Sequence, residues 1–203
     1  MFKKAFTLAE TLLVMAIIGI VATATIPNLM DSYQEDRDVA KLRSVYHDLE
    51  VAYSKAVAEY GPYEQWGNDK QKVLMKYIKA NSCGNSTINS CYPSGITGNA
   101  TSYYKYELEN GVGISLTTSL DNIYVALSGA TGKKTFGKNI FKFAYSDSNQ
   151  IYPYGKDSDR TTSNGKYNGG SQEKATNWVI TNGNMDYLRC ESQLNWTNQT
   201  SCP

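Results

Sequence analysis

The strongest constraint in this sequence is an apolar run close to its start. The run extends from Phe6 to Ile26 and follows two basic residues, Lys3 and Lys4. A helix needs about 20 apolar residues to cross a bilayer, so this run is long enough. Glu10 lies inside it, although an ionised side chain in hydrocarbon costs roughly 2.5 to 3.5 kcal/mol on insertion scales. The carboxylate of Glu10 therefore needs a partner or a purpose.

Two general interpretations of the run leave that carboxylate unexplained. The first is a secretory signal, with Leu12 to Val21 as its apolar region and Ala22-Thr23-Ala24 as a cleavage site that releases a soluble protein from Thr25. The second is a plain single-span anchor, whose N-terminal lysines keep that end of the chain in the cytoplasm. Neither interpretation gives Glu10 a role.

A third interpretation uses the residues around the start of the run. Lys3-Lys4, the small Ala5 and the series Phe6-Thr7-Leu8-Ala9-Glu10 precede an apolar helix. This pattern resembles the class III leader and N-terminus of the type IV pilin superfamily, which includes pili, the pseudopili of type II secretion and DNA-uptake pili. The resemblance implies that a prepilin peptidase cuts between Ala5 and Phe6 and methylates the new amine of Phe6. The family usually has Gly before the cut and Ile or Val at the position of Ala9.

The resemblance also gives Glu10 a partner. It implies that the carboxylate pairs with the charged amine of Phe6 on an adjoining subunit, in a filament core where an unpaired charge is heavily penalised. The pair would then set the axial register of assembly. Gly19 and Pro27 match the family pattern, and both weaken helical hydrogen bonding, as local unwinding in a filament requires. The expected assembly residues are Phe6, Glu10, Gly19 and Pro27.

Helical periodicity continues beyond the apolar run. The pattern ends at Gly61-Pro62, since Gly suits a helix C-terminal cap and Pro cannot continue a helix. We expect one helix from about residue 6 to residue 60, and a separate amphipathic helix after a break at Pro27 is the alternative. The apolar stripe of the second half consists of Val39, Leu42, Tyr46, Leu49, Tyr53, Ala56 and Tyr60.

Segments with strand character follow in the middle of the chain. Asn110-Gly111 suits a type I′ turn and predicts a hairpin between its two flanking strands. The sequence therefore predicts an α+β fold in which the long helix packs on an antiparallel sheet, as in pilins. The expected strands are Tyr103 to Glu109, Val112 to Thr118, Ile123 to Leu127, Asn139 to Tyr145 and Trp178 to Ile180, with a short helix about Val73, Leu74, Tyr77 and Ile78.

Four cysteines favour an oxidising compartment. They are Cys83, Cys91, Cys190 and Cys202, and three pairings are possible. We favour Cys83 with Cys91 and Cys190 with Cys202, because each pair closes a segment rich in Gly, Asn and Ser that has little else to hold it. Four free thiols in a cytosolic protein are the alternative.

Residues 146 to 177 are polar and predict a long surface loop. Its Asp147, Asn149, Asp157 and Asp159 could offer oxygen ligands to calcium, an ion that some pseudopilins bind in loops. Their spacing matches no EF-hand, and turn residues in water are the simpler interpretation. We therefore expect no cofactor, with calcium as the candidate to test.

Enzymatic and nucleic-acid functions find little support in the sequence. The single histidine, His47, has no histidine partner, which argues against Ser-His-Asp triads and multi-histidine metal sites. No P-loop and no G-x-S-x-G motif occurs. The 20 basic residues nearly balance the 19 acidic ones and form no basic patch, so we expect no nucleic-acid contact and no enzyme.

The expected organisation follows from these observations. Residues 1–5 form the prepilin leader, residues 6–30 the transmembrane and assembly helix, residues 31–61 an amphipathic helix, and residues 62–203 the sheet domain. The resemblance implies a subunit of a type IV pilus or type II secretion pseudopilus, which assembles with itself and with other pilin-like subunits. It would start as a single-pass inner-membrane protein with its N-terminus in the cytoplasm and end in a periplasmic or extracellular filament. The alternative is a secreted or membrane-anchored extracellular binding protein with aromatic loops.

Overall fold

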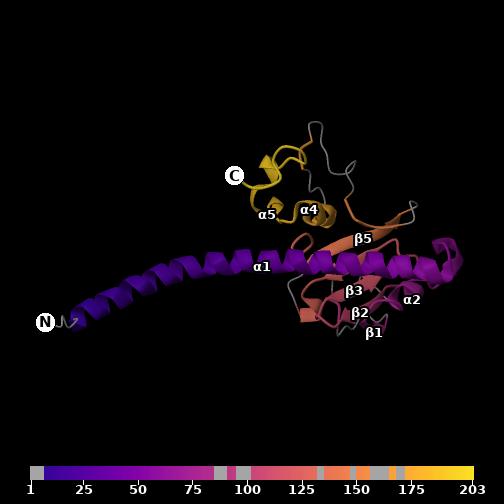
Figure 1. Cartoon of the computed structure of the whole chain (residues 1–203), viewed down its shortest axis with the longest axis horizontal. Helices are drawn as coiled ribbons and strands as arrows, with labels where there is room; N and C mark the ends of the chain where they lie inside the picture. Colours follow the sequence, from indigo (N-terminus) through magenta and orange to yellow (C-terminus); the bar gives the residue numbers. More distant parts are fainter. Residues whose placement is uncertain are drawn as a thin grey trace. The chain divides into compact units, whose positions relative to one another are not determined.

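The structure is a computed structural model, and it describes residues 7–84, 91–94, 102–131, 135–146, 150–155, 165–167 and 172–203. The chain divides into two compact units, Met1–Arg37 and Asp38–Pro203. Helix α1, from Leu8 to Tyr60, contributes to both units. Figure 1 shows the helices and strands of the chain, coloured along the sequence from indigo at the N-terminus to yellow at the C-terminus.

Within the first unit, α1 is the described element. It begins at Leu8 and continues through Pro27 without interruption. One long helix was expected, and the alternative of a break at Pro27 is wrong. A proline lacks the N–H that would bond to the carbonyl four residues earlier, so the helix passes Pro27 with one hydrogen bond fewer.

Within the second unit, one face of α1 is buried. Of the expected stripe, Val39, Leu42, Leu49, Tyr53 and Ala56 are buried and Tyr46 is half-buried, whereas Tyr60 is 39% exposed. Val45 and Ala52 are also buried, so the covered face is wider than the expected stripe. The helix ends as predicted, because Gly61 has φ +78° and its N–H donates to the carbonyl of Val57 at 3.0 Å.

Six strands form one antiparallel sheet. Each strand pairs with the next one along the chain, in the order β1-β2-β3-β4-β5-β6. The strands are β1 (Ala80–Gly84), β2 (Tyr104–Leu108), β3 (Gly113–Leu116), β4 (Ile123–Ala126), β5 (Ile140–Ser146) and β6 (Gln150–Pro153). The predicted α+β fold is therefore confirmed, and so is the hairpin between β2 and β3. Its turn is not the predicted type I′, because Gly111 has φ +76° but Asn110 does not have a positive φ. Strands β1 and β6 were not predicted.

Both faces of this sheet are covered. The main core lies on one face, where apolar side chains of β3, β4 and β5 meet the buried stripe of α1, and the rings of Tyr46 and Phe143 stack with centroids 5.5 Å apart. The second face carries a smaller cluster of Tyr92, Tyr124, Ala126 and Ile140. A polar row also crosses that face in register, and it consists of Lys105, Ser115, Tyr124 and Lys142.

Short helices complete the second unit. They are η1 (Tyr63–Trp66), α2 (Lys70–Met75), η2 (Gly129–Thr131), η3 (Gln172–Lys174), α4 (Ala175–Asn182), α5 (Tyr187–Cys190) and η4 (Glu191–Gln193). Helix α2 contains Val73 and Leu74 of the expected short helix, whereas Tyr77 and Ile78 follow its end.

The predicted strand from Trp178 to Ile180 is wrong, because these residues belong to α4. Three apolar residues in a row fit a strand or a buried helix equally well. The helix is favoured here because Ala175, Trp178 and Val179, spaced by three and four residues, enter the core together. Gly183, with φ +76°, then ends the helix and donates from its N–H to the carbonyl of Val179.

The prediction of one long surface loop over residues 146–177 is also wrong. This range holds the last residue of β5, all of β6, η3 and the start of α4. Tyr167 is buried within it, and its ring meets that of Trp178 edge-on at a centroid distance of 4.8 Å. A single tyrosine in a polar segment gives no periodicity, so composition alone could not place it in the core.

Candidate functional site

The first unit presents an apolar surface that no described residue covers. Its large apolar side chains between Leu8 and Met30 are each 53–79% exposed. They are Leu8, Leu12, Leu13, Val14, Met15, Ile17, Ile18, Ile20, Val21, Ile26, Leu29 and Met30. By length and composition α1 could cross a membrane, and this apolar stretch lies near the N-terminus. A helix that is apolar on all sides normally lies in lipid or inside a larger protein assembly.

Threonine hydroxyls within this stretch bond back to the helix itself. Thr11 Oγ1 donates to the carbonyl of Leu8 at 2.8 Å, Thr23 Oγ1 to that of Ile20 at 2.9 Å, and Thr25 Oγ1 to that of Val21 at 2.9 Å. A polar group left unsatisfied in hydrocarbon costs several kcal/mol. These internal bonds therefore make the stretch compatible with an environment that has no water.

Glu10 has a partner within its own chain. Thr7 donates to Glu10 Oε2 from its backbone N–H at 2.9 Å and from Oγ1 at 2.9 Å, and the N–H of Glu10 donates to Thr7 Oγ1 at 3.3 Å. This reciprocal arrangement is a capping box, in which the residue before a helix and the third residue of the helix satisfy each other's N–H groups. The spacing Thr-x-x-Glu is a sequence signal for it, and the sequence-based interpretation missed it.

The capping box leaves part of the carboxylate for another donor. Both donations from Thr7 reach the same oxygen, Oε2. A carboxylate has two acceptor oxygens, so Oε1 remains for a donor outside the described residues. Capping of α1 and pairing with an external ammonium group are therefore compatible functions of one side chain.

Two further expected assembly residues lie on α1. At Gly19, an added Cβ would meet no atom within 4 Å, so nothing in the described chain requires a glycine there. Pro27 lies within the helix, as described above. The expected processing residues, Ala5 and Phe6, lie outside the described residues, and so do Lys3 and Lys4.

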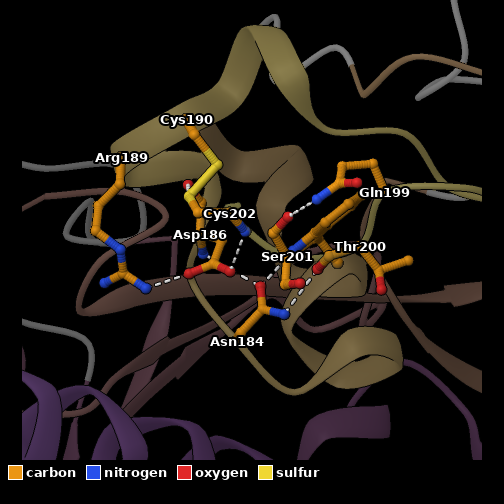
Figure 2. Close-up of a disulfide and its surroundings, with 9 residues drawn as sticks. Asn184, Asp186, Arg189, Cys190, Gln199, Thr200, Ser201 and Cys202 are labelled. Atoms are coloured by element: carbon orange, nitrogen blue, oxygen red, sulfur yellow. Dashed lines mark hydrogen bonds and ion pairs between the residues drawn. A yellow bond between two sulfur atoms is a disulfide. The ribbon is translucent and has the colours of Figure 1, made fainter.

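Both expected disulfides are present in the second unit. Cys83 is bonded to Cys91, and Cys190 is bonded to Cys202. The first joins β1 to Cys91, whose backbone carbonyl lies against Gly113 of β3. The second joins the end of α5 to the C-terminal residues (Figure 2).

The C-terminal disulfide lies beside a buried carboxylate, which Figure 2 shows at the centre of a hydrogen-bond network. Asp186 is 6% exposed, and its Oδ2 accepts from the N–H of Cys202 at 2.8 Å while its Oδ1 pairs with Arg189. Asn184 Nδ2 donates to the carbonyl of Thr200 at 2.8 Å. The segment before α5 is thus bonded to the last residues of the chain.

The remaining expected sites can be placed only in part. The candidate calcium ligands Asp147, Asn149, Asp157 and Asp159 all lie outside the described residues. Within the described ranges, no three His, Cys, Asp or Glu side chains form a group that could hold a metal ion. His47 is exposed on α1.

Comparisons with known proteins do not extend this description. No protein-family model, no curated protein and no solved structure matches this chain. The functional conclusion therefore depends on the residues and their geometry alone.

Proposed function

We propose that this chain is a structural subunit of a type IV pilus or a type II secretion pseudopilus, which assembles through the first part of α1 after cleavage between Ala5 and Phe6. The observation that carries the proposal is the uncovered apolar surface from Leu8 to Met30. It is long enough for a membrane span, and its threonine hydroxyls need no water.

Burial of this surface supplies the driving force for membrane insertion and for assembly. Each apolar side chain that leaves water contributes about 1.5–3 kcal/mol when fully buried. Lipid covers this apolar surface before assembly, and the equivalent helices of neighbouring subunits cover it in a filament. An unattached soluble protein would leave the surface in water, where contiguous apolar patches cause association.

Glu10 supplies specificity in this proposal. Oε2 caps α1 through Thr7, and Oε1 accepts from the methylated amine of Phe6 of a neighbouring subunit. A charged pair excluded from water is sensitive to position, because displacement of either partner leaves a charge unpaired. Pairing therefore fixes how far one helix is shifted along the next.

The first test is mass spectrometry of the N-terminal peptide, from protein of the native membrane or of the sheared surface fraction. The proposal requires a chain that starts at methylated Phe6. A start at Thr25 would identify a released secreted protein, and an intact Met1 would identify a plain anchor. Either of these results would refute the filament proposal.

A second test separates capping from pairing between subunits. Gln can replace Glu in a capping box, so Glu10→Gln retains the cap but removes the negative charge. We expect Glu10→Gln and Glu10→Ala to reduce filament yield to a similar extent, with the mature protein still present in the membrane. Normal yield from Glu10→Gln beside low yield from Glu10→Ala would show that capping alone explains this residue.

A further inference from the structure

The last residues of the chain are held by few buried groups. Leu194 is 1% exposed, and no side chain in residues 195–203 is buried. Trp196 is partly buried and its ring meets that of Trp178 edge-on at 4.5 Å. Beyond it, Gln199 exchanges two backbone hydrogen bonds with Asn195. The residues after Gln199 are held by the bonds from Asn184 and to Asp186 and by the disulfide of Cys202 (Figure 2).

The two disulfides differ in their access to a reducing thiolate. Cys91 is fully buried, so attack on its sulfur is blocked, and attack on Cys83 would expel a thiolate into a site without water. Cys190 and Cys202 are both half-buried, so either sulfur can be attacked and the leaving thiolate can reach solvent. Reduction should therefore begin at the C-terminal disulfide.

Loss of this disulfide has a local consequence. The N–H of Cys202 reaches Asp186 Oδ2 because the disulfide holds the backbone of Cys202 against α5. Without the disulfide, residues 201–203 regain their conformational freedom, because the backbone bonds between Asn195 and Gln199 hold the chain only as far as Gln199. The carboxylate of Asp186 then loses a donor at a site that is 6% exposed. The start of α5 then opens toward water, because water can replace the donor that Asp186 has lost. The sheet and α1 keep their own core.

We infer that the Cys190–Cys202 disulfide is a redox-sensitive latch, which a dithiol opens while the rest of the second unit stays folded. In the opening step, a thiolate of the dithiol attacks one sulfur and expels the other, and its second thiol resolves the mixed disulfide. Two electrons and two protons pass to Cys190 and Cys202, and the reagent leaves as its disulfide. The inference does not depend on the proposed filament function.

The test uses the full chain in detergent micelles and a dithiol titration. At each concentration, free thiols are trapped with iodoacetamide, and the alkylated cysteines are mapped by mass spectrometry. The trapped samples are then treated briefly with trypsin, which can cut after Arg189 in α5 and after Arg43 in α1. Cleavage at Arg189 reports opening of the latch, and cleavage at Arg43 reports unfolding of the whole unit.

We expect Cys190 and Cys202 to be alkylated at lower dithiol concentration than Cys83 and Cys91. Cleavage after Arg189 should then accelerate by about tenfold or more, with no change at Arg43, because proteolysis follows the population of the open form. The inference is wrong if both disulfides are reduced together, if Cys83 and Cys91 react first, if Arg189 stays protected after reduction, or if Arg43 becomes cleavable in parallel.

A double variant provides the matched control. Cys190→Ser with Cys202→Ser should show rapid cleavage after Arg189 in the absence of dithiol, with Arg43 still protected. Slow cleavage of the folded double variant would also overturn the inference. If the double variant does not fold, the titration of the unmodified chain decides the question.

Discussion

Arg43 of α1 donates a hydrogen bond from Nη2 to the backbone carbonyl of Ile180 in α4, at 3.0 Å. This carbonyl belongs to the last turn of its helix, where unpaired carbonyls accumulate and a cation is favoured. The guanidinium also lies against Gly183, since an added Cβ at that position would be 2.8 Å from Nη2. One side chain therefore joins the central part of α1 to the C-terminal helices of the second unit.

This contact predicts the effect of replacing Arg43. Because the side chain is exposed, Arg43→Ala should lower the free energy of unfolding by about 1 kcal/mol, and Arg43→Lys should retain part of that stability through its charge. Thermal unfolding of the full chain in mild detergent, followed by near-UV circular dichroism, measures the difference. Equal stability of Arg43→Ala and the parent chain would show that the bond contributes nothing.

Gly113 predicts a larger effect. An added Cβ there would lie under 3.0 Å from the carbonyl oxygen of Cys91, a separation that real Cβ atoms essentially never show. Gly113→Ala should therefore destabilise the second unit by about 1–3 kcal/mol, as overpacking of a core does. Gly19→Ala is the matched control, because the added atom meets nothing within 4 Å. The same unfolding measurement should separate the two variants, and similar melting temperatures would contradict the prediction.

Replacements of Lys142 and Glu173 should have coupled effects on the free energy of unfolding. Their charged groups are 3.5 Å apart, with 11% and 24% of the side chains exposed, and Lys142 Nζ lies 4.0 Å from the centre of the Tyr154 ring. Glu173→Gln should cost about 1 kcal/mol or more, since the enclosed ammonium loses its counter-charge. Combining it with Lys142→Met should recover part of that loss. A double-mutant cycle without coupling would rule out this pair as a stabilising contact.

Tyr63 predicts a loss of stability in alkali. Burial, together with the charge of Asp121, raises the pKa of Tyr63 to about 12 from its ordinary value of 10.0. Between these two pH values the unfolded chain has released this proton and the folded chain has not, so stability falls as pH rises. Urea unfolding at a series of alkaline pH values should show a decline that is shallower in Tyr63→Phe. An identical pH dependence in both proteins would contradict the assignment.

The local signals that predicted the fold correctly share one property. The end of α1 at Gly61 and the β2–β3 hairpin at Gly111 each depend on a residue that tolerates positive φ within a short segment. The need for positive φ at a position arises from the adjacent residues of the same turn, so a glycine there can be recognised in the sequence alone. The long helix was equally clear, because its apolar residues repeat over many turns.

The errors arose where distant residues decide the structure. Strand β1 has polar and exposed residues and depends on its pairing with β2. Helix α4 has few apolar residues, so its helical face becomes apparent only against the core. The capping box of Thr7 and Glu10 differs from these cases, because its Thr-x-x-Glu spacing is a local signal that the sequence displays.

The strand order has a consequence for the synthesis of this protein. Every strand pairs with the one that precedes it in the chain, so the sheet can grow strand by strand as successive segments emerge. Contacts between near neighbours form quickly, because little chain entropy is lost when short loops close. Cys190 and Cys202 both follow β6 in the chain, so the bond between them can form only after all six strands have emerged. Closure of this disulfide is thus a later event than the emergence of the sheet strands.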